Sequence, residues 1–427
     1  MKLKIGVFGA HRGKAMIKTL LSYPAAELVA VCDMHVPSLE NVRKMAEDAG
    51  MEVALYENFD DFFNHEMDAV VLANYATEHV PYAIRCLNAG RHVMSECVPC
   101  ETMAQAVELI EAVERSGKVY AYAENCCYMT HAFEMWQKYK EGALGEVTYA
   151  EGEYIHDLTS VWPDVTYGDP NHWRNRMYPT FYCTHSLGPI IAATGKRPIQ
   201  VVGYELPPRE RSYNEMGIVA GAGVEMVTLD NGAVVKSIHG GFTREHAGKW
   251  NFQIYCQNGM MESARFNEQK NFHMYKEGAE VCKGTWEKYD PVIEIARPFA
   301  LKGTDMRVHG GADFYATYFF IEKILGKPDG QWSIDVYQAV DMGICGLLAW
   351  KSAVNGNIPI RVPNLRNTEE RDAYRNDHAC TTPGVAGDQL MPITTYPHDP
   401  VPAEKYEEVR QKWLANEERR SQQRKNK

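Results

Sequence analysis

The chain has 427 residues, of which 45% are hydrophobic and 24% charged, typical of a globular protein with two or three domains. Its formal net charge of −11 argues against a nucleic-acid surface, because no basic excess neutralises phosphates. The longest apolar runs are strand-sized, so we expect no membrane-spanning segment, and no apolar signal segment precedes the first predicted strand. The 11 cysteines are scattered, so we expect reduced thiols and a cytoplasmic location.

Strand and helix patterns alternate through the first 125 residues. Near-continuous apolar strands are predicted at 3–9, 28–33, 68–74, 91–95 and 119–125, with helices between them at 13–22, 37–50, 80–90 and 101–117. Apolar strands separated by amphipathic helices indicate a parallel sheet covered on both faces.

After residue 145 the pattern changes to longer, partly alternating strands. These are predicted at 145–156, 199–206, 223–230, 233–241 and 250–257, with turn sequences such as "DNG" and "QNG" between them. Such a series indicates a largely antiparallel sheet. A buried helix is predicted at 333–354, and the charged tail 404–427 predicts a solvated helix that frays. We therefore expect an α/β protein with domains at 1–125 and 126–365 and a C-terminal extension at 366–427.

The segment "GVFGAHRGKA" (6–15) joins the first predicted strand to the first helix. A dinucleotide-binding turn needs glycines for tight curvature and for close approach of the pyrophosphate to the helix N-terminus. Here the second glycine position is occupied by His11, so an ordinary strand-to-helix turn remains an alternative. The candidate cofactor contacts of this turn are Gly9, His11, Arg12 and Gly13.

Asp33 ends the second predicted strand, about 20 residues further on, where a carboxylate accepts hydrogen bonds from the adenosine ribose. No arginine follows it directly to bind a 2′-phosphate, which favours NAD over NADP. A helix-capping role is the alternative for Asp33 alone. The segment "ANYATEH" (73–79) adds Asn74, Tyr75, Thr77 and His79, which we expect on the nicotinamide side of the cleft, although Thr77 would also suit a helix cap.

The stretch "SECVPC" (95–100) begins at the end of the strand predicted at 91–95, where open α/β sheets bind ligands. Cys97 and Cys100 form a C-x-x-C, which in such a chain can be a redox dithiol. A metal corner and the rim of a cofactor site are the other two interpretations. No second C-x-x-C is present to complete a zinc site.

Three segments together resemble the glucose–fructose oxidoreductase/inositol dehydrogenase (Gfo/Idh/MocA) superfamily. They are "AVVLANYATEHVPYAIRCLNAGRHVMSE" (69–96), "GALGEV" (142–147) and "HGGADF" (309–314), and the resemblance covers roughly residues 3 to 365. It implies a Rossmann domain followed by an α/β domain whose open sheet carries the substrate site. That sheet usually forms the dimer interface as well, so we expect a homo-oligomer.

In the dehydrogenases of this superfamily, "HVMSE" continues with Lys-Pro, and the lysine helps to polarise the hydroxyl being oxidised. Here Glu96 is present, but Cys97 stands where the lysine is expected. A cysteine is a poor substitute for an ammonium that donates to a developing alkoxide. The resemblance therefore makes "SECVPC" the rim of the nicotinamide pocket, with Glu96 and Cys97 beside the cofactor.

The segment "YCTHSLGP" (182–189) resembles the signature of the NAD-dependent glycosidases of this superfamily, whose type member is an α-N-acetylgalactosaminidase. Those enzymes also lack the lysine. The resemblance places Glu124, Tyr154, Tyr182 and His185 in the active site. This chain has Cys183 and Ser186 where the signature has proline and glycine, which indicates a sister family.

The implied reaction is glycoside hydrolysis with tightly bound NAD that is regenerated in each cycle. Hydride leaves C3 of the sugar, the resulting ketone acidifies the C2 proton, the aglycone leaves from C1, water adds, and the hydride returns. Tyrosine and histidine suit the acid and base steps. Which of Tyr154, Tyr182 and His185 acts as acid or base stays open, as do the sugar, the anomer and the aglycone.

Further candidates concern the substrate and a divalent metal. Cys183 and His185 could ligate a metal that binds the C3 ketone oxygen, and Glu151, Glu153, His156 and His309 are also available. Candidate substrate contacts are His156, Trp173, Arg174, His309 and Asp313, where Trp173 would stack on a sugar face or, alternatively, simply pack. The alternative functions are a sugar or cyclitol dehydrogenase and a non-catalytic NAD-binding sensor.

Overall fold

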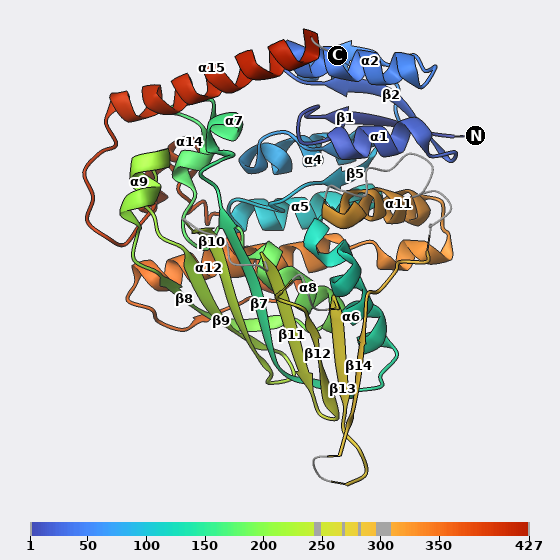
Figure 1. The fold of residues 1–427 in the computed structure, drawn as a ribbon, viewed down its shortest axis with the longest axis vertical. Helices are drawn as coiled ribbons and strands as arrows, with labels where there is room; N and C mark the ends of the chain where they lie inside the picture. The colour runs from blue at the N-terminus through green and yellow to red at the C-terminus, as the bar shows by residue number, and fades with distance from the viewer. Residues whose placement is uncertain (1, 243–248, 267–269, 281–282, 296–308, 426–427) are drawn as a thin grey trace.

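A computed structural model describes the chain except residues 1, 243–248, 267–269, 281–282, 296–308 and 426–427 (Figure 1). Its first sheet has six parallel strands in the order β3-β2-β1-β4-β5-β6. The strands are β1 (Leu3–Phe8), β2 (Ala26–Cys32), β3 (Ala54–Tyr56), β4 (Ala69–Leu72), β5 (His92–Ser95) and β6 (Tyr120–Tyr122). The parallel sheet expected from the sequence is confirmed, with β3 as an additional short strand.

The helices of this half are α1 (Lys14–Ser22), α2 (Val36–Asp48), α3 (Phe59–Phe63), α4 (His79–Asn88) and α5 (Met103–Ser116). Every residue of β4 is buried, as expected for a strand covered on both faces. Part of that cover comes from far along the chain, because α11 (Ala312–Ile324) packs on α1. The Tyr23 hydroxyl donates to Glu322 Oε1 at 2.8 Å across this contact.

The second sheet has nine strands in the order β14-β13-β12-β11-β7-β10-β9-β8-β15. They are β7 (Val147–Asp157), β8 (Pro198–Glu205), β9 (Gly223–Leu229), β10 (Val234–Phe242), β11 (Trp250–Cys256), β12 (Gly259–Ser263), β13 (Phe272–Lys276), β14 (Thr285–Tyr289) and β15 (Ile360–Arg361). Only β7 and β10 pair in parallel among these described strands. The mostly antiparallel sheet is thereby confirmed.

Helices α6 (Thr130–Lys140), α8 (Thr184–Thr194) and α12 (Val336–Val354) cover the face of this sheet that looks toward the first sheet (Figure 1). The buried helix expected at 333–354 is α12. The remaining short helices are α7 (Trp162–Thr166), α9 (Glu210–Met216), α13 (Thr368–Arg371) and α14 (Pro383–Ala386). The 3-10 turns are η1 (Ala76–Glu78), η2 (Asn125–Tyr128), η3 (Trp173–Arg176), η4 (His309–Gly311), η5 (Pro328–Trp332), η6 (Asp372–Tyr374) and η7 (Gly387–Gln389).

The charged tail forms α15 (Ala403–Lys425), the red helix along the top of Figure 1. The expectation of a solvated, fraying helix is wrong in one respect, because α15 packs on α7 and α9. Val409 is buried against Trp162 and Met216, and the Trp413 ring lies 5.4 Å from that of Tyr167. None of the described helices combines the length and apolar character needed to cross a membrane. The domain boundaries at 125 and 365 stay predictions.

Candidate active site

The four predicted catalytic residues come from three separate elements and meet at one place. Glu124 follows β6, Tyr154 lies in β7, and Tyr182 and His185 flank the start of α8. His185 Nδ1 is 2.7 Å from Glu124 Oε1. The Tyr182 ring stacks on the His185 ring at 5.2 Å, and the Tyr154 ring meets it edge-on at 4.7 Å.

Close backbone packing between β7 and α8 brings these side chains together. A Cβ on Gly152 would lie 1.9 Å from the Ser186 carbonyl oxygen, so only glycine permits this approach. Ser186 Oγ and Ser237 Oγ hydrogen-bond at 2.8 Å and tie α8 to β10. Tyr154, two residues after Gly152, is thereby held beside the first turn of α8.

Glu124 is fully buried, yet its carboxylate is ionised. Burial alone would raise its pKa, but His185 and hydrogen bonds from Thr184 and Cys97 lower the pKa to about 2. An ionised carboxylate only accepts hydrogen bonds, so the proton of this contact belongs to His185 Nδ1. In the neutral imidazole this leaves Nε2 as the unprotonated nitrogen, suited to accept a proton.

The two tyrosines are held as phenols. Burial raises the pKa of Tyr154 well above its ordinary value, and burial also raises the pKa of Tyr182, although Arg174 opposes the shift. Tyr182 Oη accepts from Arg174 Nη1 at 3.2 Å. The hydroxyl of Tyr154 lies 2.8 Å from His156 Nδ1. Both hydroxyls are therefore suited to donate protons or hydrogen bonds.

The turn after β1 fits a dinucleotide. Gly9 has φ of +102°, and a Cβ there would lie 2.2 Å from the Ala73 carbonyl oxygen, while one on Gly13 would lie 2.5 Å from Gly9 O. Asp33 Oδ2 accepts from Ala10 N at 2.7 Å, which fixes the carboxylate at the end of β2. The turn lies where the strand order reverses between β1 and β4, the position at which such sheets bind nucleotides.

Comparison with known proteins also supports a dinucleotide-binding site in the first sheet. Residues 3–124 match the family described as an oxidoreductase family with an NAD-binding Rossmann fold (GFO_IDH_MocA). Residues 3–124 are thus similar to that family and carry its NAD-binding Rossmann fold.

Over most of its length, the chain is similar to proteins named glycosyl hydrolase family 109. The one from Saccharopolyspora erythraea is 24% identical, with 85% of this chain and 83% of that protein covered. The one from Porphyromonas gingivalis is also 24% identical, with 88% and 87% covered.

Solved structures share the fold at lower identity. An NAD-binding oxidoreductase from Klebsiella pneumoniae has a TM-score of 0.65 at 17% identity, with 85% of this chain and all of that chain covered. A scyllo-inositol dehydrogenase from Lactobacillus casei with bound NAD(H) and scyllo-inositol has a TM-score of 0.62 at 17% identity, with 86% of this chain and all of that chain covered.

Arg12, in the glycine turn after β1, forms ion pairs with two carboxylates. Its Nη2 lies 2.6 Å from Glu96 Oε1 and 3.1 Å from Asp313 Oδ1. Burial alone would lower the pKa of Arg12, but the two acidic side chains raise it. Asp313, which we expected to contact substrate, thus joins α11 to the nucleotide-binding turn.

The segment after β4 only partly faces the cleft. Tyr75 is exposed and its ring lies 4.9 Å from that of His172, and Asn74 and Thr77 are half-buried. His79 is buried, and its Nδ1 is 3.4 Å from the Val98 carbonyl oxygen. Burial lowers the pKa of His79 to about 4, so it is a neutral support behind the "SECVPC" rim. That His79 lies on the nicotinamide side of the cleft stays a prediction.

The candidate substrate residues fall into different places. Trp173 is buried, with the Arg174 guanidinium carbon 4.2 Å from its ring centroid and the Phe181 ring at 5.6 Å, so it packs and does not offer a free face to a sugar. His156 and Arg174 lie beside Tyr154 and Tyr182, respectively. His309 begins η4, and its side chain lies outside the described residues.

The structure brings together a different set of possible metal ligands from the one expected from the sequence. Among the described residues, one group of three has its ligand atoms within 4.8 Å of one another: Cys97, Glu124 and His185. Cys183 is buried and its Sγ lies 3.2 Å from the Met342 carbonyl oxygen in α12, which separates it from this group.

The acidic residues considered for a metal are paired with cations. Glu153 pairs with Arg265 at 2.6 Å, and Glu151 pairs with Lys236. Within the group of three, burial raises the pKa of Cys97, which disfavours the thiolate that a metal needs. Hydrogen bonds already join its members.

Cys97 lies at the rim, its Sγ 3.1 Å from Glu124 Oε2. Burial raises the pKa of Cys100 to about 12 and also raises that of Cys97, whereas a redox dithiol needs a depressed thiol pKa. Both cysteines are free thiols.

We expect Cys97→Ala with Cys100→Ala to leave activity within about tenfold of the parent, because the lost S–H donor is weak. The measurement is turnover of a glycoside with and without dithiothreitol. A loss of activity that follows oxidant or reductant would revive the redox dithiol.

Sequence reasoning missed the ion pairs of Arg12, and no local signal could have found them. Arg12 and Asp313 are 301 residues apart in the chain, so only the packing of α11 on α1 brings them together.

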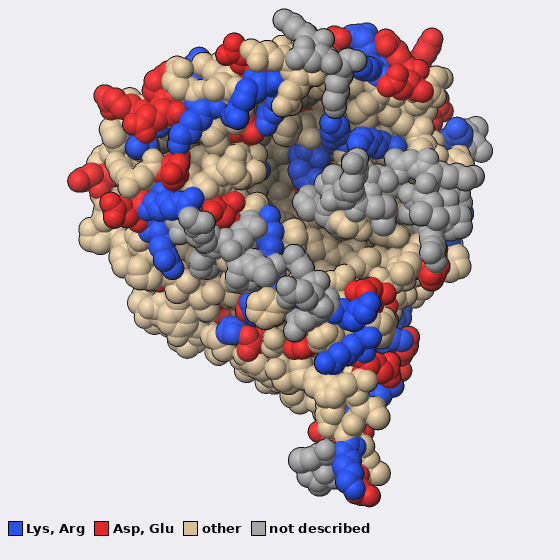
Figure 2. All heavy atoms as spheres, in the orientation of Figure 1, with Lys and Arg blue, Asp and Glu red and all other residues tan. Residues whose placement is uncertain are grey.

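Figure 2 shows a hollow between the first sheet above and the second sheet below, with basic side chains beside it.

Proposed function

We propose that this protein is an NAD-dependent glycoside hydrolase. The observation that carries the proposal is the Glu124–His185 pair, flanked by Tyr154 and Tyr182, at a rim where Cys97 replaces the lysine of the dehydrogenases. The similarity to proteins named glycosyl hydrolase family 109 over most of both chains supports it.

We propose that Gly9, Gly13 and Asp33 hold NAD, which stays bound between turnovers. When bound, NAD would take a hydride from C3 of the sugar and return it after the aglycone has left. The protein's own part is to position C3 at the rim and to move protons around it.

His185 is the proposed base, because Glu124 holds the proton on Nδ1 and leaves Nε2 free to remove the C2 proton. Glu124 also stabilises the imidazolium that results. Tyr154 and Tyr182, kept protonated by burial, donate to sugar or leaving-group oxygens.

We further propose a cytoplasmic homo-oligomer that assembles through the nine-stranded sheet. Helices α6, α8 and α12 cover one face of this sheet. The opposite face carries apolar side chains that are half-buried or exposed, namely Val202, Tyr204, Val224 and Met226. Apolar side chains left on a sheet face favour burial against a second copy.

The test is hydrolysis of a panel of aryl glycosides in D₂O with no added nucleotide. We expect deuterium at C2 of the released sugar, because a proton taken by His185 exchanges with solvent before one returns. The C3 hydride should not exchange. Free sugar incubated with the enzyme in D₂O is the control for later exchange. Unlabelled C2, with NADH accumulating as substrate is lost after NAD⁺ is supplied, would instead identify a dehydrogenase.

A further inference from the structure

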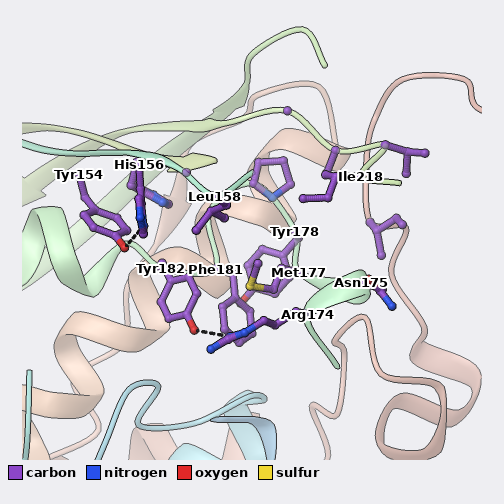
Figure 3. A pocket seen from close by; sticks show the side chains of 17 residues that line it. Tyr154, His156, Leu158, Arg174, Asn175, Met177, Tyr178, Phe181, Tyr182 and Ile218 are labelled. Carbon is purple, nitrogen blue, oxygen red and sulfur yellow. Dashed lines mark hydrogen bonds between the residues drawn. The ribbon is translucent and has the colours of Figure 1, made fainter. Parts of the chain in front are cut away.

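A pocket adjoins the catalytic tyrosines, and most of its wall is apolar (Figure 3). Tyr154, His156, Arg174 and Tyr182 form its polar end, and the two further polar lining residues, Asn175 and His239, hydrogen-bond the Asp169 carbonyl oxygen and Glu225. Figure 3 shows Leu158, Met177 and Ile218 extending away from that end. The apolar lining includes Leu158, Met177, Phe181, Ile218, Val219 and Ile393.

The pocket lies at the far end of a chain of contacts that starts at the nicotinamide rim. Cys97 Sγ is 3.1 Å from Glu124, and Glu124 is 2.7 Å from His185. The His185 ring then meets the ring of Tyr154, which lines the pocket. In a pyranose whose C3 faces the rim, the substituents on C1 and C5 are the ones that point away from it.

The polar groups at the mouth are already engaged. His156 Nδ1 is hydrogen-bonded to Tyr154, and Arg174 donates to Tyr182 while its guanidinium stacks over Trp173. An oligosaccharide needs many hydrogen-bond partners when its hydroxyls are desolvated. An apolar group needs none and gains free energy on leaving water.

We propose that this pocket is the aglycone subsite and that the natural substrates carry an apolar aryl or alkyl aglycone. The proposal rests on the proposed glycosidase function. The aglycone is chosen over a C5 substituent because the leaving group must lie next to a proton donor, and Tyr154 is both protonated and part of the lining.

The first test compares kcat/KM for methyl, propyl and hexyl glycosides of whichever sugar the aryl panel identifies. These alcohols have similar acidity, so leaving-group strength stays nearly constant. We expect about a fourfold rise per methylene until the pocket is filled. Equal values for methyl and hexyl glycosides would overturn the proposal, as would a chain-length preference for alkyl groups on O6 in place of O1.

Substitution of the wall supplies the second test. Ile218→Asp should reduce the hexyl-to-methyl ratio of kcat/KM by about tenfold, and the milder Ile218→Thr should reduce it in part. Ile358, an exposed isoleucine outside the pocket lining, gives the matched control Ile358→Asp, which should leave the ratio unchanged. Circular dichroism checks that each variant is folded, and a ratio unaffected in folded Ile218 variants would contradict the assignment.

A binding measurement separates failure of this proposal from failure of the glycosidase function. Saturation-transfer NMR with benzyl alcohol requires no turnover, and glycerol serves as the polar control. We expect contact with benzyl alcohol that Ile218→Asp weakens. If no glycoside is hydrolysed but this binding is seen, the pocket takes an apolar group and the glycosidase function fails, and the aglycone assignment fails with it. If hydrolysis occurs without this binding, the glycosidase function stands and the aglycone subsite is wrong.

Discussion

Replacing His185 with alanine should lower kcat for glycoside hydrolysis by about 10²–10⁴-fold, the range for loss of an acid–base group. His185 Nδ1 is bound to the fully buried Glu124, so the substitution removes the imidazole that this carboxylate orients. The substitution should lower kcat more than it raises KM, because His185 acts on proton transfer in the transition state and not on binding of the substrate in the ground state.

A conservative variant distinguishes proton transfer from mere support. His185→Asn keeps an N–H that can reach Glu124, yet it cannot accept a proton at the Nε2 position. We expect it to fold like the parent and to lose nearly as much kcat as the alanine variant. Near-parental kcat in His185→Asn would show that His185 only positions its neighbours.

The same substitution should change the pH dependence of stability. In the parent, the pKa of Glu124 is about 2, below its ordinary value of 4.5. The contact of the Glu124 carboxylate with His185 therefore contributes stability above pH 4.5 that is lost as the pH falls toward 2. Without His185, burial raises the pKa of Glu124, so the variant should lose stability as the pH rises above 4.5. Urea unfolding between pH 4 and 8 measures both slopes, and equal slopes would contradict this account.

The sheets were predictable because their periodicities are local. The four residues 69–72 are apolar in sequence and all buried in β4, and the "DNG" and "QNG" turns join antiparallel strands as expected. The strand β3 was missed because its three residues are only half-buried and carry little pattern. The packing of α15 was missed because its apolar contacts depend on few residues, chiefly Val409 and Trp413.

The sequence predicted which residues lie together in the candidate active site, but not what each of them does. The signature at 182–189 and Glu124 supplied residues that do lie together, but their roles still rest on proposal. Cys97, and not Cys183, lies beside His185. The sequence could not show this, because it depends on the direction that each cysteine side chain takes, one at the start of α8 and the other at the rim. The pairing of Glu153 with Arg265 depends on strands that are distant in sequence.

Replacing Arg12 with methionine should destabilise the protein by about 3 kcal/mol, because two acidic side chains would lose their shared cation. The exposed fractions decide the size of the effect: Glu96 is 6% and Asp313 2% exposed, so neither is rehydrated without local opening. Arg12 itself is 35% exposed, and solvent screens part of each interaction, so we place the effect at the low end of what broken buried pairs cost.

The double variant Arg12→Met with Asp313→Asn makes the cause testable. If the loss comes from stranded negative charge, removing one carboxylate should restore part of it, so the two changes should be less than additive. Urea unfolding at one fixed NAD⁺ concentration measures the free energies, and the Kd for NAD⁺ measured for each variant allows the contribution of cofactor binding to be subtracted. Arg12→Lys, which keeps the charge but not the fork that meets both acids, should fall between the parent and Arg12→Met. Additive losses, or a methionine variant as stable as the parent, would show that Glu96 and Asp313 are held by other partners and that Arg12 does not join α11 to the nucleotide-binding turn.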